Sequence, residues 1–231
     1  MLLAIEATDR GGGVALVRDN EIIELVCETS TRTHSERLMS QIDSMLKKRD
    51  IEYQQIDCIA VSTGPGSFTA IRLGVTTAKT LAYCCDASLV GVSNLRLLAE
   101  YGAGPVRRLE SAICARRGEL YRQSFKQQSG KITPLSEPHL IKPEDLRQEL
   151  NDGPEVLLLY RGRNWRPDLK QWSENVVFYP AFMSDILVSS LIEVASRRFE
   201  RGATDRVDHI SPCYIRRSDA QRSKEKENAN K

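Results

Sequence analysis

Short apolar runs and helically spaced apolar positions alternate along the first part of the chain. Runs at 2–6, 14–18 and 21–28 predict strands, because apolar residues are continuous or alternate over the length of a typical strand. Asp19-Asn20 lies between the last two runs and tolerates the positive φ of a tight hairpin. These strands are expected to form an antiparallel meander.

A helical segment follows the meander. Thr33 and Glu36 have the spacing of a capping box, and apolar residues then recur at helical spacing from Leu38 to about Lys48. Beyond it the pattern predicts, in order, a strand at 58–62, a helix at 67–84 and a strand at 89–92. Buried strands separated by helices are typical of parallel pairing with crossover helices.

The second half begins with a similar pattern. It predicts strands at 111–115, 119–126 and 131–135, a helix that opens at Lys142-Pro143, a strand at 155–160 and a last helix from Met183 to Arg201, which Gly202 ends. A second, degenerate meander-plus-helix unit is the natural interpretation. The predicted fold class is therefore α/β, with two tandem subdomains built on mixed sheets.

The boundaries of this organisation follow from the element pattern. The N-terminal subdomain is expected to cover residues 1–102 and the C-terminal one residues 103–216, and the last helix can pack back on the first subdomain. After Arg216 the composition turns to polar residues with no apolar side chain except alanine. Residues 217–231 are therefore expected to form a disordered tail.

Charge and hydropathy restrict the classes of function. Lys and Arg total 33 against 31 Asp and Glu, so the net charge of +2 gives no global field for general nucleic-acid binding, and any contact with RNA would be local. No apolar run approaches the roughly 20 residues that a membrane helix needs. The N-terminus has no basic region and reaches Glu6 after a few apolar residues, unlike a signal peptide, so a cytoplasmic location is expected.

The cysteines and histidines suggest neither a disulfide framework nor a metal site. The six cysteines mostly lie inside apolar patterns, where buried thiols act as small hydrophobes, and no CxxC occurs. His34, His139 and His209 are far apart in the sequence. No metal, cofactor or catalytic residue is therefore predicted.

The most informative segment is Ser62-Thr63-Gly64-Pro65-Gly66-Ser67-Phe68-Thr69-Ala70-Ile71-Arg72-Leu73-Gly74. It combines a strand end, a tight turn and a helix start at which Ser67 can cap exposed amides. Such a helix start could hold an anion, with Gly64, Gly66 and Ser67 as contacts, but the glycines could equally serve only to permit the turn. It is not a Walker A loop, because no Gly-Lys-Ser or Gly-Lys-Thr follows.

This segment closely resembles the GPGSFTGLRIG signature of the TsaB (YeaZ) family. Other segments resemble family motifs too: Ile5-Glu6-Ala7-Thr8 an Asp-Thr-Ser-like turn, His34-Ser35-Glu36-Arg37-Leu38 the HSERL-type first helix, Gly91-Val92-Ser93-Asn94-Leu95 the GVSTL motif, Ala115-Arg116-Arg117-Gly118-Glu119-Leu120-Tyr121 the DARMGEVY motif and Pro212-Cys213-Tyr214-Ile215-Arg216 the closing PVYLR. The predicted topology resembles the actin, sugar-kinase and Hsp70 superfamily, which is built from duplicated ribonuclease-H-like domains.

The resemblance implies a noncatalytic scaffold and activator in the bacterial machinery that forms threonylcarbamoyladenosine next to the anticodon of tRNAs reading ANN codons. Its implied partners are the paralogue TsaD, the ATPase TsaE through the complex, and a second copy of the chain when alone, with tRNA contacted indirectly. The rival interpretations are a free-standing ATPase or kinase of the same fold and a metallopeptidase-like enzyme. Both rivals need metal ligands or a nucleophile that the motifs do not supply.

Some positions depart from the family pattern. Glu6 stands in place of an Asp, Ala70 in place of a Gly, and Cys114 in place of the Asp before Ala-Arg. Glu6 and Thr8 join the glycine turn as candidate anion or nucleotide contacts, but Glu6 could instead cap the Thr8 turn or pair with a nearby base. These departures argue against a paired metal site.

The first two helices are the candidate partner interface, because the resemblance implies that they pair between subunits. The residues assigned to it are His34, Leu38, Ile42, Met45, Phe68, Ile71, Arg72 and Val75. The alternative for each of these side chains is that it covers the protein's own sheet.

Overall fold

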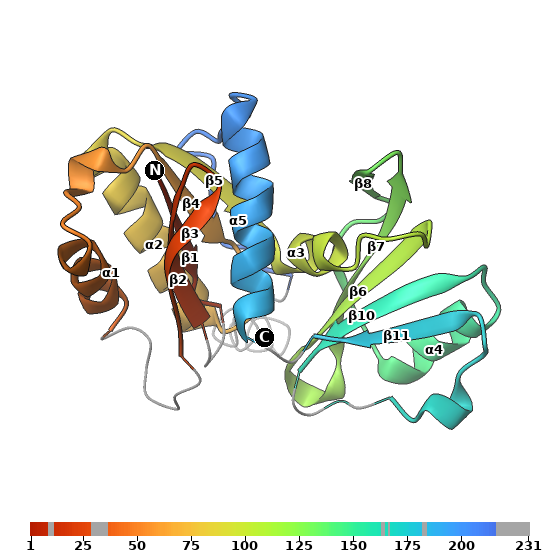
Figure 1. Cartoon of the computed structure of the whole chain (residues 1–231). Coiled ribbons are helices and arrows are strands. Elements are labelled where there is room, and N and C mark those ends of the chain that lie inside the picture. The colour runs from red at the N-terminus through yellow and green to blue at the C-terminus, as the bar shows by residue number, and fades with distance from the viewer. Residues whose placement is uncertain (9–11, 29–36, 163–164, 166, 182–183, 216–231) are drawn as a thin grey trace, which may run out of the picture.

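The fold consists of two mixed β-sheets with helices packed on and between them (Figure 1). The structure is a computed structural model that describes residues 1–8, 12–28, 37–162, 165, 167–181 and 184–215. His34, the Thr33–Glu36 capping box and the predicted tail lie outside the described residues. No helix among the described residues is long and apolar enough to cross a membrane.

The N-terminal sheet has the strand order β3-β2-β1-β4-β5. Its strands are β1 (Leu2–Glu6), β2 (Gly12–Arg18), β3 (Glu21–Glu28), β4 (Cys58–Ser62) and β5 (Ser88–Val92). β1, β2 and β3 are antiparallel, whereas β4 and β5 continue from β1 in parallel. Asp19 and Asn20 have φ of 52° and 63° in the hairpin, which confirms the turn predicted from this pair.

The C-terminal sheet repeats this topology. Its strands are β6 (Arg108–Cys114), β7 (Leu120–Gln128), β8 (Lys131–Pro134), β9 (His139–Ile141), β10 (Val156–Arg161) and β11 (Val176–Pro180). The order is β11-β10-β6-β7-β8, with β9 beside β7; β6, β7 and β8 are antiparallel, and β10 and β11 follow in parallel. The predicted tandem ribonuclease-H-like units are thus confirmed, while β9 and β11 are missing from the prediction.

Helices cover the N-terminal sheet on both faces (Figure 1). The helices are α1 (Leu38–Lys48), α2 (Phe68–Cys85), α3 (Asn94–Tyr101), α4 (Pro143–Asn151) and α5 (Ser184–Glu200). Pro143 occupies the first turn of α4, and Gly202 follows α5 with φ of 64°, both as expected. Ser67 is the N-cap of α2, but its hydroxyl makes no capping hydrogen bond, so that part of the prediction is wrong.

One apolar cluster connects the two sheets through α3 and α5. It includes Leu98 of α3, Leu191 of α5, Ala4 of the first sheet and Leu109 and Leu159 of the second. Although α5 follows the last strand of the C-terminal sheet, it lies against β1 and β2 of the N-terminal one. The halves of the chain therefore share a core, which the packing of side chains from both sheets stabilises.

A second apolar cluster fills the space between the N-terminal sheet and helices α1 and α2. Five of the residues assigned to the partner interface belong to it: Leu38, Ile42, Met45, Ile71 and Val75. Their side chains are at most 4% exposed, so they cover the chain's own sheet and the partner assignment of these five side chains needs correction. The physical reason is that a helix on a sheet buries one stripe of apolar residues against it, and these five side chains make up part of that buried stripe on α1 and α2.

The cysteines are less uniformly buried than the sequence predicts. Cys58 is buried, Cys27 and Cys84 are exposed, and the others are intermediate. Burial raises the pKa of the Cys58 thiol to about 12, because the thiolate loses its hydration inside the sheet.

Replacing Ile42 by Ala should destabilise the protein by about 2–5 kcal/mol, because the fully buried side chain leaves a cavity. Met39 lies on the same helix but is 45% exposed, so Met39→Ala should change the free energy of unfolding by less than about 0.5 kcal/mol. Urea unfolding followed by circular dichroism measures both. Equal midpoints for the two variants would contradict the packing of α1.

Thiol alkylation should separate the cysteines in the native state. At pH 8, Cys84 should react with iodoacetamide while Cys58 should not, because a thiol whose pKa lies above the working pH holds little thiolate and a buried one is inaccessible. Peptide mass spectrometry after brief labelling measures this, and labelling in urea provides the control in which Cys58 reacts. Rapid native labelling of Cys58 would contradict its burial.

Candidate functional site

The Gly-Pro-Gly turn joins β4 to α2 and lies directly against the end of β1. A Cβ atom on Gly66 would lie 2.1 Å from the carbonyl oxygen of Thr8, so only glycine allows this approach. Gly64 has φ of 95°, and its peptide bond to Pro65 is cis. The Ser67 amide donates to the Thr8 carbonyl oxygen at 2.6 Å. Gly66 is thus explained by backbone contact and Gly64 by its positive φ, and the Ser67 amide is already engaged within the chain.

A buried polar network holds the end of β1 to the same turn. Oε1 of Glu6 accepts hydrogen bonds from the Thr8 amide, at 3.0 Å, and from the Thr8 hydroxyl. Nδ2 of Asn94 donates to the Thr8 hydroxyl oxygen at 2.5 Å and to the Pro65 carbonyl oxygen at 3.2 Å. The interpretation of Glu6 as the cap of the Thr8 turn is therefore confirmed.

Asn94 is the member of this network that the sequence analysis missed. It is 2% exposed and begins α3, where its amide donates to the carbonyl oxygen of Gly64 at 2.7 Å. It lies within the segment that resembles the family's GVSTL motif, but the sequence of that segment does not indicate which distant residues the asparagine side chain contacts. Oε2 of Glu6 and Oδ1 of Asn94 have no hydrogen-bond partner among the described residues.

The matching position in the second unit carries no charge. Glu6 ends β1 and Cys114 ends β6, the strands that occupy the same place in the two sheets. A Cβ atom on Gly162 would lie 2.2 Å from the Cys114 sulfur, so the end of β10 packs closely on this thiol. In the described part of the chain, no group of three or more His, Cys, Asp or Glu side chains is placed to hold a metal ion. Among the described residues, the two matched strand ends thus offer one carboxylate, which is engaged in a turn, and no second carboxylate beside it.

The outer surface of α1 and α2 carries the exposed members of the predicted interface. Phe68 is 37% exposed and Arg72 is also exposed, and both lie at the beginning of α2. Met39 on α1 and Tyr83 near the end of α2 are 45% and 85% exposed. Of the residues assigned to partner binding, Phe68 and Arg72 are therefore the ones that the described structure presents to solvent.

The C-terminal segment completes this surface. Tyr214 packs against Phe68 with ring centroids 4.9 Å apart, and its hydroxyl oxygen accepts a hydrogen bond from Nε of Arg72 at 2.7 Å. The Arg72 guanidinium lies 4.0 Å from the centroid of the Phe68 ring, in a cation–π geometry. The Cys213 amide holds the segment in place by donating to the Thr63 carbonyl oxygen at 2.8 Å. Tyr214 lies in the closing motif, but its contact with α2 was not predicted.

Comparison with known proteins gives matches over almost the whole chain. Residues 25–194 match the family model described as TsaD, tRNA N6-adenosine threonylcarbamoyltransferase. The chain is 33% identical to the tRNA threonylcarbamoyladenosine biosynthesis protein TsaB of Haemophilus influenzae, with 93% of each chain covered. It is 29% identical to the Bacillus subtilis protein of that name, with 95% of this chain and 96% of the relative covered.

The transferases themselves match over a shorter stretch. A tRNA N6-adenosine threonylcarbamoyltransferase of Bacillus thuringiensis is 36% identical over 39% of this chain and 23% of its own length. Among solved structures, YeaZ from Pseudomonas aeruginosa has the same fold, with a TM-score of 0.70 at 21% identity over 92% of this chain and 98% of that one. Because the full-length agreement is with the biosynthesis proteins, the chain belongs to the TsaB family, whose members take part in the threonylcarbamoyladenosine modification of tRNA.

Proposed function

We propose that this protein is a noncatalytic scaffold and activator subunit of the complex that forms N6-threonylcarbamoyladenosine next to the anticodon of tRNAs reading ANN codons. In this role it binds TsaD directly and TsaE through the complex, and it forms a homodimer when alone. The observation that carries the proposal is which side chains stand at the ends of β1 and β6, the strands that occupy the same place in the two sheets. Glu6 is a buried backbone cap, and Cys114 is a thiol packed on Gly162.

This arrangement favours a scaffold over an enzyme for a chemical reason. Transfer or hydrolysis of a phosphoryl group needs charges placed around the phosphates, usually a metal held by carboxylates. Here one carboxylate oxygen of Glu6 accepts a hydrogen bond from its own turn, and the equivalent residue at the end of β6 is a cysteine, Cys114. A free-standing ATPase, kinase or metallopeptidase would need ligands that the described residues do not bring together.

The outer face of α1 and α2 is the proposed surface for TsaD and for the second copy. Its exposed apolar side chains, Met39, Phe68 and Tyr83, lie on a face whose opposite side is fixed in the core. A rigid helix pair with a few exposed aromatic and methionine side chains is the kind of surface on which partner binding concentrates. Because the same face serves both partners in this proposal, TsaD and a second copy compete for it.

Phe68→Glu should weaken association with TsaD at least tenfold while leaving the monomer folded, because it places a charge on the proposed interface at a side chain that is 37% exposed. Size-exclusion chromatography with light scattering, alone and with TsaD, measures association, and circular dichroism measures folding. Leu169→Glu is the matched control, since Leu169 is 60% exposed in the C-terminal half. Normal TsaD binding by folded Phe68→Glu would place the interface elsewhere.

The purified protein should hydrolyse neither ATP nor peptides at a measurable rate. Glu6→Gln should instead lower stability by about 1–3 kcal/mol, because the Thr8 amide and hydroxyl lose a charged acceptor in a buried site. Phosphate-release assays and urea unfolding measure the two effects. ATP turnover that disappears in Glu6→Gln while the variant remains folded would support the enzyme alternative.

A further inference from the structure

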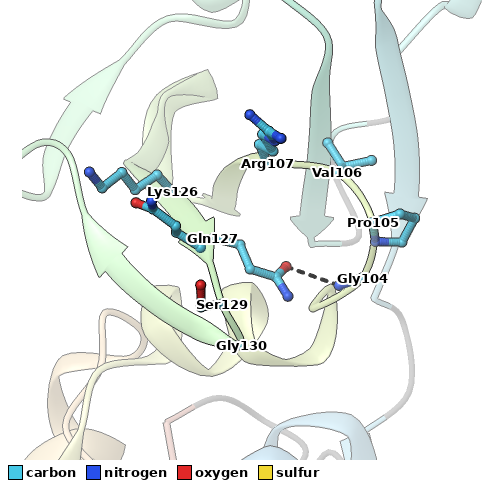
Figure 2. A pocket seen from close by; sticks show the side chains of 9 residues that line it. Gly104, Pro105, Val106, Arg107, Lys126, Gln127, Ser129 and Gly130 are labelled. Carbon is cyan, nitrogen blue, oxygen red and sulfur yellow. Dashed lines mark hydrogen bonds between the residues drawn. The ribbon is translucent and has the colours of Figure 1, made fainter.

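A hollow of about 580 Å³ lies at the end of the C-terminal sheet where β6 begins. The loop from Gly104 to Arg107 forms one wall, and the β7–β8 hairpin from Lys126 to Gly130 forms the other (Figure 2). The main-chain amide of Gly104 donates to Oε1 of the Gln127 side chain at 3.0 Å, and the main-chain amide of Gln127 donates to the Arg107 carbonyl oxygen at 2.7 Å. Loop and hairpin are therefore held together, and the hollow is part of the folded structure.

The charged groups of this hollow are both cationic. Arg107 and Lys126 are exposed, and neither forms an ion pair with a residue that the structure describes. Figure 2 shows Gln127 reaching to Gly104, with Arg107 and Lys126 extending away from that hydrogen bond. Arg108 differs, because its guanidinium lies 3.1 Å from Oε1 of the fully buried Glu110. Arg107 and Lys126 thus remain available to an anionic ligand.

Two exposed tyrosines border the same loop. Tyr101 ends α3 just before the loop, and Tyr179 lies on the edge strand β11; they are 39% and 44% exposed. Their ring centroids are 5.4 Å apart at an angle of 68°, and their hydroxyl oxygens are 3.3 Å apart. Each ring is held by the other and still presents surface to solvent.

The strand registers place Tyr179 and Arg107 on one face of the second sheet. Leu109 of β6, Leu157 of β10 and Val177 of β11 are neighbours across the strands, and side chains in register point to the same face. Tyr179 follows Val177 by two positions, and Arg107 precedes Leu109 by two, so both share that face. Val177 is itself 43% exposed. Lys126 is paired with Arg108, so it lies on the opposite face and lines the hollow from that side. The two tyrosines, Arg107 and Lys126 are together called the margin of the second sheet.

We propose that this margin binds RNA directly, with unpaired bases stacking on Tyr101 and Tyr179 and phosphates contacting Arg107 and Lys126. The inference deepens the proposed function, since it rests on tRNA being the substrate of the complex. Stacked aromatic rings beside cations are the common chemistry of single-stranded and loop RNA binding, and the amides of Gln127 and Gln128 can hydrogen-bond to base edges. The surface thus supplies a local, direct RNA contact of the kind that the net charge leaves open, in place of the indirect tRNA contact that the family resemblance implies.

RNA fits this surface better than a protein partner does. The hollow is lined largely by polar groups and backbone, including Gln127, Gln128 and Ser129, and lacks a large apolar anchor. Its two cations match the charge of a phosphate backbone. The apolar helix face at Phe68 lies on the other sheet, so protein and RNA contacts are expected to be separable.

The test measures binding of the full chain to a fluorescein-labelled, unmodified tRNA that reads an ANN codon, by fluorescence anisotropy at several salt concentrations. Tyr101→Ala and Tyr179→Ala should each weaken binding about tenfold, the loss typical of one stacked base. Arg107→Glu/Lys126→Glu should weaken binding and reduce the log–log salt slope by about 0.7 for each phosphate that the protein no longer neutralises. The same variants are then assayed in the complex with TsaD.

The matched control is Lys142→Glu/Lys170→Glu, which makes the same change of net charge at two exposed lysines away from the hollow. It should bind RNA more tightly than Arg107→Glu/Lys126→Glu. Equal RNA affinity of all folded variants and the parent, alone and in the complex, would overturn the proposal. So would variants that lose TsaD binding but keep RNA binding, because the margin would then be a protein interface.

Failure of the proposed function gives a different result. If the parent chain does not associate with TsaD but its RNA binding depends on Tyr101 and Arg107, the scaffold proposal fails and the RNA surface stands. If Phe68→Glu loses TsaD binding but keeps RNA binding, while Tyr101→Ala and Tyr179→Ala lose RNA binding, both proposals are supported.

Discussion

The apolar cluster in which α5, packed on the first sheet, meets α3, packed on the second, is the constraint on which the rest of the structure depends. The chain leaves the first sheet through α3, builds the second sheet, and then returns α5 to the first. Leu98 and Leu191 belong to the same cluster as Leu109 and Leu159, so the two sheets share this cluster in addition to the apolar cluster that each sheet has on its other face. This shared packing fixes where the ends of β1 and β6 lie and which surfaces stay free.

The two units have diverged around a common topology. In the first, α2 connects β4 to β5 and covers the sheet together with α1. In the second, the connection from β10 to β11 contains one short 3-10 helix among its described residues, at Leu169–Gln171. Trp165 and Trp172 lie on that side and contact each other and the aromatic side chains of the strands. Large aromatic rings thus bury sheet surface where the first unit uses a helix.

The two units present surfaces of different chemistry, one apolar and one polar and cationic. The α1 and α2 face presents Met39 and Phe68, with Arg72 held between Phe68 and Tyr214. The margin of the second sheet presents two cations at a polar hollow and a pair of tyrosines outside it. The proposed scaffold role, with an enzyme and its RNA substrate held by one molecule, needs two such surfaces in a fixed arrangement, and the packed core that joins the two sheets supplies it.

The sequence determined the local elements and the turn. The period of apolar residues placed α1, α2 and both meanders, because strands and helices differ in the spacing of buried positions. The pair Asp19-Asn20 specified its hairpin, and the Gly64-Pro65-Gly66 segment specified a tight connection. Short elements with weak periodicity, such as α3, β9 and β11, escaped the prediction because their assignment depends on neighbouring strands and helices.

Tertiary structure alone decided how those residues are used. Leu38 and Phe68 both belong to apolar helix stripes, yet one is 4% exposed and the other 37%, because only one side of each helix meets the sheet. Asn94 and Thr8 are far apart in the sequence, and their hydrogen bond exists because β5 brings the start of α3 beside the end of β1. Tyr101 and Tyr179 meet for the same reason, across the edge of the second sheet. Spacing along the chain records which side chains share a face of one element; which faces of different elements meet is set by packing.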